Sequence, residues 1–409
     1  MPRSRTWGPA LLRLGAVLAT LILAPAGASS QEPEPRPELP RGADPGSAQA
    51  YYDRGVELLR RDPRAAAEMF RWASRLDPEW AEPYEGRRAA IMIAQQRGLQ
   101  EYFKLSRRVE AFRLADSLRV QASMRNPLQM RPFEGEVVQA AVRAMARSMD
   151  PTQVLDPAEL EFLIERDARS NSLELRAMLA YSNHELPYAL ELYQEGIERG
   201  DSISKGFLLS DRAHVLAVAG RYEEARVEYD SALAALRKLD EDFVFSYQSK
   251  ALQLYSMGLM DELLENQTQA RADYNAALVE DLSFHPAHQA LARLSLAEGD
   301  TASALFAYRM AADLAPDDPT IRMKVAGLLV ATGDPEGAET EIEAAMAANV
   351  DYAAPHLVMG ALAERAGEPV DAMTHYERFL ELAPRAHRNR PTIQNRVAAL
   401  KAAAGEDPR

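Results

Sequence analysis

Cysteine is absent from the 409-residue sequence. Its absence excludes disulfides, thiolate metal sites, a catalytic cysteine and the lipid-modified cysteine of a bacterial lipoprotein. A chain without cysteine also passes through an oxidising compartment without mispaired thiols. Lysine is scarce as well, since arginine supplies 41 of the 47 basic residues, and the formal net charge is −14. This acidic balance argues against nucleic-acid binding, because a phosphate backbone requires a basic surface.

Motifs that commonly carry catalysis are also missing. No GxxxxGK[ST], GxGxxG, GxSxG or HExxH pattern occurs in the sequence. His285 and His288 are three residues apart, but Pro286 lies between them and no third ligand accompanies them. We therefore predict a chain with no metal, no cofactor and no enzymatic activity.

The first 48 residues are predicted to lie outside the folded part of the chain. Residues 1–28 combine a basic head, an apolar run over residues 14–23 and an Ala-Gly-Ala exit, which is typical of a secretory signal peptide. The apolar run is shorter than the roughly 20 residues of a membrane-spanning helix, so an uncleaved anchor is the less favoured alternative. Residues 29–48 are rich in proline and are predicted to form a disordered linker. We expect a periplasmic or secreted protein without a stable membrane anchor after cleavage.

A repeat of 34 residues organises most of the remaining chain. In "EGDTASALFAYRMAADLAP", which begins at residue 298, a Gly-Asp turn precedes an alanine and a tyrosine four residues apart. The key alanine recurs at positions 270, 304, 338 and 372, and earlier units place it at 225 and 189. Spacings of three and four put these side chains on one helix face, where small residues let helix axes approach closely. The residues predicted to pack the repeats are Ala189, Tyr193, Ala225, Tyr229, Ala270, Tyr274, Ala304, Tyr308, Ala338, Ala372 and Tyr376.

This pattern resembles the tetratricopeptide repeat (TPR) family, whose unit is a 34-residue helix-turn-helix. The resemblance implies an all-α fold, a right-handed superhelical solenoid of such repeats. It covers residues 170–386 as about six repeats, and residues 49–84 carry an earlier TPR-like unit. Residues 85–169 fit the pattern poorly and are predicted to form an irregular helical segment, while residues 387–409 are predicted to form a capping helix and tail. Glycines at positions 299, 333 and 367 are predicted to end the first helix of their units.

In the TPR family, the first helices of successive units line a groove that accepts extended or helical peptides. By register, the groove of this chain would contain Glu174, Met178, Tyr181, Phe207, Ser210, His214, Tyr255, Leu259, Gln289, Arg293, Met323 and Leu357. Seven of these twelve side chains are apolar or aromatic, and the lysine and asparagine pairs with which some members clamp a carboxylate are absent. The resemblance thus implies a non-catalytic protein–protein interaction scaffold or adaptor of the cell envelope. Its partner would be a protein or peptide that presents an apolar strand or helix.

Two alternatives stay open. The first is a helical-repeat enzyme or enzyme subunit with its site in residues 85–169, which a pocket of convergent carboxylates or histidines there would favour. The second is a self-assembling structural protein that uses its outer face or its end caps, which a mass measurement by light scattering would distinguish.

Overall fold

The computed structural model describes residues 36–96, 170–200, 202–238 and 250–403, together with positions 114, 117, 118, 121, 122 and 125. Contacts divide the chain into Met1–Glu38 and Leu39–Arg409, and the helices named here all belong to the second unit. In chain order, these helices are α2 (Ala48–Leu58), α3 (Pro63–Leu76), α4 (Glu82–Gln96), α8 (Ser170–Ser182), α9 (Leu186–Arg199), α10 (Ser202–Val218), α11 (Tyr222–Lys238), α12 (Lys250–Leu263), α13 (Gln267–Glu280), α14 (His285–Ala297), α15 (Thr301–Leu314), α16 (Pro319–Thr332), α17 (Pro335–Ala348), α18 (Ala353–Ala366), α19 (Pro369–Leu382) and α20 (Arg390–Ala403).

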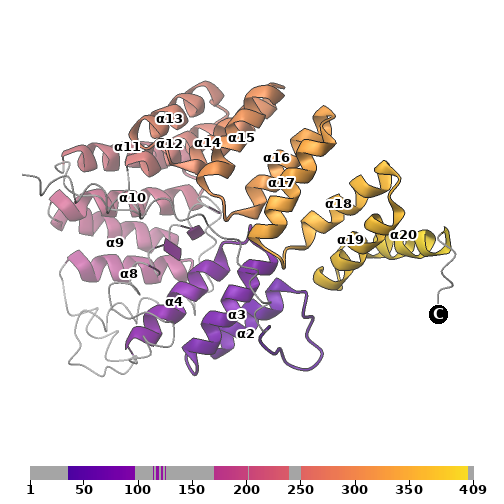
Figure 1. Cartoon of the computed structure of the whole chain (residues 1–409). Helices are drawn as coiled ribbons and strands as arrows, with labels where there is room; N and C mark the ends of the chain where they lie inside the picture. Colours follow the sequence, from indigo (N-terminus) through magenta and orange to yellow (C-terminus); the bar gives the residue numbers. More distant parts are fainter. Residues whose placement is uncertain are drawn as a thin grey trace, which may run out of the picture. The chain divides into compact units, whose positions relative to one another are not determined.

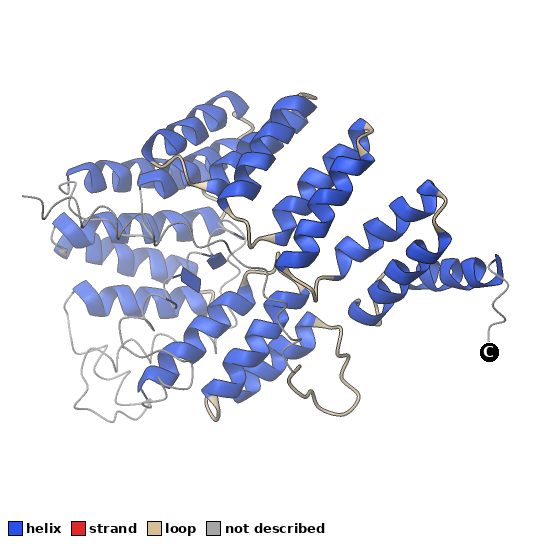
Figure 2. Ribbon diagram, viewed as in Figure 1, coloured by secondary structure: helices blue, strands red, loops and turns tan. Residues whose placement is uncertain are grey.

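Consecutive helices pack against each other in pairs. The pairs are α2 with α3, α8 with α9, α10 with α11, α12 with α13, α14 with α15, α16 with α17 and α18 with α19. Figure 1 shows the two members of each pair side by side, and Figure 2 shows helices joined by short loops with no strand in the parts that are described. The predicted all-α fold of helix-turn-helix repeats is therefore confirmed for these ranges.

The turns inside the repeats follow from glycine and aspartate. Gly299, Gly333 and Gly367 have φ angles of 80°, 85° and 82°, the left-handed conformation in which glycine carries no steric penalty. Asp334 then caps α17, because its carboxylate accepts a hydrogen bond of 2.9 Å from the amide of Gly337. The prediction that these glycines end the first helix of each unit is confirmed.

The apolar core continues from one repeat to the next. One cluster of buried side chains joins α10 through α14, and another extends from α14 to α18. All eleven predicted packing residues lie in the interior, at most 8% exposed. A single helix pair cannot bury its own apolar face, so each pair is stabilised by its neighbours along the chain.

Two first helices carry a glycine that lies directly under a tyrosine ring of the second helix. A Cβ atom added to Gly258 would lie 2.6 Å from the Tyr274 ring, and one added to Gly360 would lie 2.5 Å from the Tyr376 ring. Both tyrosines are buried on the second helix of the same pair. Glycine thus lets the aromatic ring rest directly on the backbone of the preceding helix.

Several predicted segments lie wholly or partly outside the described residues. The signal peptide over residues 1–28 lies outside them, as does most of the irregular segment over residues 85–169. Of the predicted linker, Leu39 packs against the cluster formed by α2, α3 and α4. At the other end, Ile393 and Val397 of α20 are buried against α18 and α19. In the described ranges, no helix combines the length and the apolar character needed to cross a membrane.

Candidate functional site

Hydrogen bonds join the first helices α8, α10 and α12, and they involve three predicted groove residues, Tyr181, Ser210 and His214. The hydroxyl of Tyr181 lies 3.2 Å from Nε2 of His214, and the two rings meet edge to face at 5.8 Å. One repeat further on, Nε2 of Gln253 donates to Oγ of Ser210 at 3.0 Å. Burial raises the pKa of Tyr181 well above its usual value, so this phenol stays protonated. The first helices are therefore joined by specific polar contacts as well as by apolar packing.

Three of the predicted groove residues are buried, namely Ser210 at 8% exposed and two residues of the apolar core. Tyr255 and Leu259 are each 6% exposed and belong to the cluster that joins α10 to α14. The Tyr255 ring lies 5.5 Å from the ring of Tyr274 and 5.5 Å from that of Phe284. Burial raises the pKa of Tyr255 to about 12. Both side chains support the repeats in this structure, and a substitution at either position would test folding before it tested binding.

The predicted groove residue Arg293 is held by the preceding repeat. It forms an ion pair with Glu262, which also accepts a hydrogen bond from the hydroxyl of Tyr274. The same arrangement recurs near the C-terminus, where the hydroxyl of Tyr376 donates to Glu364 at 3.1 Å and Arg396 pairs with that carboxylate. In both places, one glutamate binds two partners: the tyrosine on the second helix of its own pair and an arginine on the helix that follows the pair. Arg293 therefore contributes to the junction between repeats.

Half-buried apolar side chains remain on the first helices. Met323 of α16 and Leu357 of α18 pack at the edges of two core clusters while part of each side chain stays accessible. Met178 of α8 is likewise half-buried, as are Phe207 of α10 and Gln289 of α14. The four apolar side chains of this set offer apolar contacts, and Met323 and Leu357 are 34 residues apart. Glu174 completes the predicted set and is also half-buried.

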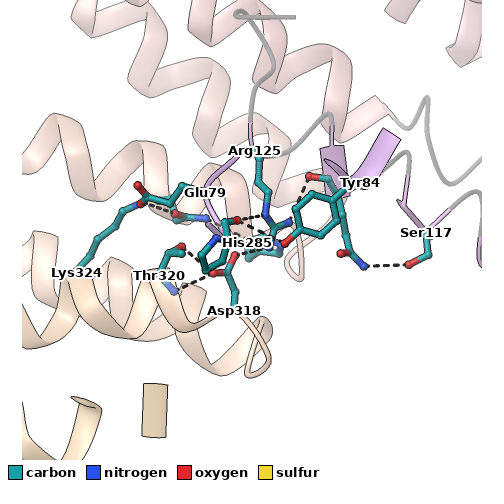
Figure 3. A network of polar contacts seen from close by, with 11 residues as sticks. Glu79, Tyr84, Ser117, Arg125, His285, Asp318, Thr320 and Lys324 are labelled. Carbon is teal, nitrogen blue, oxygen red and sulfur yellow. Dashed lines mark hydrogen bonds and ion pairs between the residues drawn. The ribbon is translucent and has the colours of Figure 1, made fainter. Parts of the chain in front are cut away.

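A small polar pocket lies beside Gln289. Its volume is about 220 Å³, and its lining residues are Glu79, Arg125, His285, Gln289, Asp318, Thr320 and Lys324. Figure 3 shows Arg125 meeting side chains from the turn before α4 (Glu79), from the N-terminus of α14 (His285) and from the first half of α16 and the residue before it (Asp318, Thr320 and Lys324). Of this set, only Gln289 belongs to the predicted groove.

Arg125 is the most constrained side chain of the pocket. Its guanidinium donates to the carbonyl of Pro78 at 2.7 Å, pairs with Asp318 at 3.2 Å and stacks 4.3 Å from the Tyr84 ring centre. Asp318 also caps α16, because it accepts from the amide and the hydroxyl of Thr320 at 3.0 and 2.7 Å. Each of these groups therefore satisfies several partners at once.

Lys324 and His285 are less tightly engaged. The Lys324 ammonium lies 3.9 Å from Glu79 and 3.4 Å from the amide oxygen of Gln289. Burial lowers the pKa of His285, so this imidazole is neutral near pH 7. Two carboxylates and two cations balance each other around the pocket. Such an arrangement can orient a polar group of a ligand.

Further polar contacts join residues before α4 to the later repeats. Arg75 pairs with Asp351 at 2.7 Å, and the side-chain amide of Asn349 donates to the Arg75 carbonyl at 2.7 Å. The amide of Arg385 donates to the carboxylate of Asp44. In the described residues, the apolar clusters that contain α2 to α4 include no side chain from α14 onward. These long-range contacts are therefore mainly polar.

The repeat register does not reveal these polar contacts. A repeat pattern relates each residue to its equivalents 34 positions away and says nothing about partners 193 or 274 positions apart. The sequence signal that was present is modest. Asp318 precedes Pro319 and Thr320 as a helix cap, and Lys324 is one of six lysines in the chain.

Comparison with known proteins bears on the later repeats. A family model described as "Tetratricopeptide repeat" matches residues 295–362, the segment that contains α15 to α17. No curated protein sequence matches the chain significantly. The predicted resemblance to the family is therefore confirmed for this segment.

Solved structures show only a general likeness to the chain. The APC/C hetero-tetramer Cut9-Hcn1 is 13% identical, with 86% of this chain and 76% of that chain covered and a TM-score of 0.39. A tetratricopeptide repeat protein from Parabacteroides merdae is 16% identical, with 70% and 98% covered and a TM-score of 0.36. YrrB, a TPR protein with an unusual peptide-binding site, is 18% identical, with 51% and 96% covered and a TM-score of 0.33. Function is therefore inferred from the chain's own residues.

Proposed function

We propose that this chain is a non-catalytic scaffold of the cell envelope that binds an apolar strand or helix of a partner protein along its first helices. The observation that carries the proposal is the set of half-buried apolar side chains at Met178, Met323 and Leu357 on first helices. Met323 and Leu357 stand one repeat apart on α16 and α18, and Met178 lies on α8, so an elongated ligand along the first helices would meet these contacts in turn. Methionine adapts its shape to irregular apolar surfaces.

The polar groups beside this apolar row would fix the orientation of the ligand. Gln289 lies on α14 between the other contacts and also lines the polar pocket with Lys324. A polar end or side chain of the ligand would compete with Glu79 for the Lys324 ammonium, which lies 3.9 Å from that carboxylate. The apolar contacts would supply the binding affinity, and the polar pocket would determine the direction in which the ligand lies.

The setting in the cell envelope rests on the signal-peptide pattern over residues 1–28. The absence of cysteine agrees with an oxidising compartment. Sequencing the N-terminus of the protein purified from an envelope fraction tests this part separately. A start near residue 29 supports export with cleavage, and an intact residue 1 in the cytoplasm contradicts it.

Affinity capture with two matched variants tests the binding proposal. One variant replaces Met178, Met323 and Leu357 by glutamate, which places charges in the proposed contacts. The control replaces Val279, Phe306 and Val370 by glutamate, since these side chains are 87%, 68% and 64% exposed on second helices. The chain from residue 29 serves as bait on native envelope extract, and circular dichroism verifies that both variants keep their helices.

We expect the unchanged chain and the control to retain the same partner and the first variant to lose it. The charged side chains would have to be desolvated at the contact, which costs more than apolar binding supplies. Equal capture by both variants would contradict binding along the first helices. Loss of capture in the control alone would shift the contact to the second helices.

A further inference from the structure

Two histidines face each other across the last complete helix pair. His356 of α18 and His375 of α19 bring their Nδ1 atoms to 3.1 Å, with ring centres 5.4 Å apart and planes inclined by 33°. Both side chains are half-buried, so solvent reaches the pair. A neutral pair at this distance shares one proton, with one Nδ1–H donating to the other Nδ1.

The backbone around the pair holds this geometry. His375 directly precedes Tyr376, whose ring rests on Gly360, where an added Cβ would lie only 2.5 Å from the ring. The turn between the two helices closes at Gly367 in the left-handed conformation. A close helix crossing and a short turn thus limit how far the imidazoles can separate, which is the preorganisation that a two-ligand site requires.

The separation of the two nitrogens matches that of ligands on one metal ion. Histidine nitrogens bind Zn²⁺ at about 2.0–2.1 Å, so two of them at tetrahedral angles lie about 3.3 Å apart. The observed 3.1 Å is close to this separation, but ring centres 5.4 Å apart show that the two nitrogens point directly at each other, so each ring must turn for both lone pairs to meet at one ion. We propose that Nδ1 of His356 and Nδ1 of His375 bind one divalent transition-metal ion, with water in the remaining positions.

The protonation state of the pair suits this role. Burial, followed by the neighbouring His375, lowers the pKa of His356 to about 4, and burial also lowers the pKa of His375. Both rings are therefore neutral near pH 7. Metal binding requires the shared proton to move from Nδ1 to Nε2 of its own ring through solvent, so no net proton is released.

The charges around the pair are mixed. Arg378 and Glu381, which pair with each other at 2.8 Å, act on His356 with opposite signs and Arg378 acts more strongly, while Asp371 acts on His375 as a negative charge. Throughout the described residues, no group of three or more histidine, cysteine, aspartate or glutamate side chains is placed to hold a metal. Water therefore completes the coordination, and imidazole donors favour Cu²⁺, Ni²⁺ and Zn²⁺ over Mg²⁺.

Another histidine pair provides a control. His285 and His288 share α14, but Nε2 of His288 lies 3.2 Å from the carbonyl of Leu282, and Nδ1 of His285 lies 3.4 Å from the amide nitrogen of Gln289. Each of these rings is engaged with its own partner. Replacing His288 by glutamine should therefore leave metal binding at the α18–α19 pair unchanged.

Titration of the untagged chain with Cu²⁺, Ni²⁺, Zn²⁺ and Mg²⁺ by calorimetry tests the proposal. We expect one Cu²⁺ per chain to bind more tightly than Zn²⁺, no heat from Mg²⁺, and at least a tenfold loss of affinity in His356→Gln and in His375→Gln. Electron paramagnetic resonance of the Cu²⁺ form should show two coordinated nitrogens in the parent and His288→Gln chains, and fewer in the two site variants. Circular dichroism checks the folding of each variant, and the two single substitutions test the site independently.

The opposite results would overturn the proposal. Affinity unchanged in both His356→Gln and His375→Gln, with folding retained, would show that the pair is only a hydrogen bond between helices. Loss of binding in His288→Gln alone would move the site to α14. Heat from Mg²⁺ equal to that from Cu²⁺ would show general binding by the acidic surface.

Discussion

Replacing Gly258 by alanine tests whether the closeness of α12 and α13 depends on the missing side chain. The added Cβ would lie 2.6 Å from Cε1 and 2.8 Å from Cδ1 of Tyr274. Non-bonded carbon atoms rest at about 3.5–4.0 Å, so the ring or the helix must move by about 1 Å. The ring has little freedom, since Tyr274 is fully buried and its hydroxyl is bound to Glu262.

Two opposing effects decide the size of the change. Overpacking a dense interior costs about 1–3 kcal/mol of unfolding free energy. Alanine in place of glycine inside a helix returns about 0.5–1 kcal/mol, because the unfolded chain loses conformational freedom. We therefore expect Gly258→Ala to lower the free energy of unfolding by about 0.5–2 kcal/mol.

Gly327→Ala provides the matched control. Gly327 lies within α16 and has no neighbouring atom within 4 Å of the position where a Cβ would stand. Only the backbone effect operates there, so this variant should be more stable than the parent by about 0.5–1 kcal/mol. Urea unfolding followed by circular dichroism compares the two variants. Equal stabilisation of both would refute the packing argument, because it would show that the Tyr274 ring yields without cost.

Two further predictions concern charged groups. Burial, and then the hydrogen bond with Asp261, raise the pKa of Asp273 from 3.8 to about 6. The folded protein therefore binds this proton more tightly than the unfolded chain does. The resulting stabilisation of the fold is complete below pH 3.8 and is lost as the pH rises through 6. Asp273→Asn should remove up to about 3 kcal/mol of this pH dependence in urea unfolding between pH 4 and 7, and parallel curves for parent and variant would contradict the assignment. The Arg75–Asp351 pair, at 2.7 Å with side chains 22% and 11% exposed, should give a coupling energy of about 1–2 kcal/mol in a double-mutant cycle of alanine substitutions. A coupling that is zero at low salt would show that this contact adds nothing to stability.

The positions of the helix turns could be predicted because their signals are local. A left-handed glycine followed by a capping acid depends on residues within one turn of the chain, and the turns at Gly333 and Gly367 follow this rule. The alanine and tyrosine packing positions could be predicted equally well, since helical spacing alone places them on the buried face. Each of these local patterns is weak alone, but their recurrence along the chain makes the prediction of a repeat fold strong.

The burial of Tyr255 could not be predicted in the same way. Register placed it on the groove face, but Phe284 lies just before α14 and packs edge to face on the Tyr255 ring at 5.5 Å. Phe284 belongs to the connection between two repeats, which the pattern of packing residues does not include. An aromatic residue in a connecting turn can therefore convert a groove position of one repeat into a core position.

The long-range polar contacts show a second limit of repeat-based reasoning. Stability in a repeat array is a sum over neighbouring units, and the apolar clusters from α10 to α18 follow this rule. The contacts of Arg75 with Asp351 and of Arg125 with Asp318 join units that are distant in sequence, and they do so through charge.

Salt weakens partly exposed ion pairs while it leaves apolar packing intact. Raising the ionic strength should therefore loosen these long-range contacts before it affects the contacts between adjacent repeats. Hydrogen exchange would detect this as earlier loss of protection around Asn349 and in the turn before α4 than within α12 and α13.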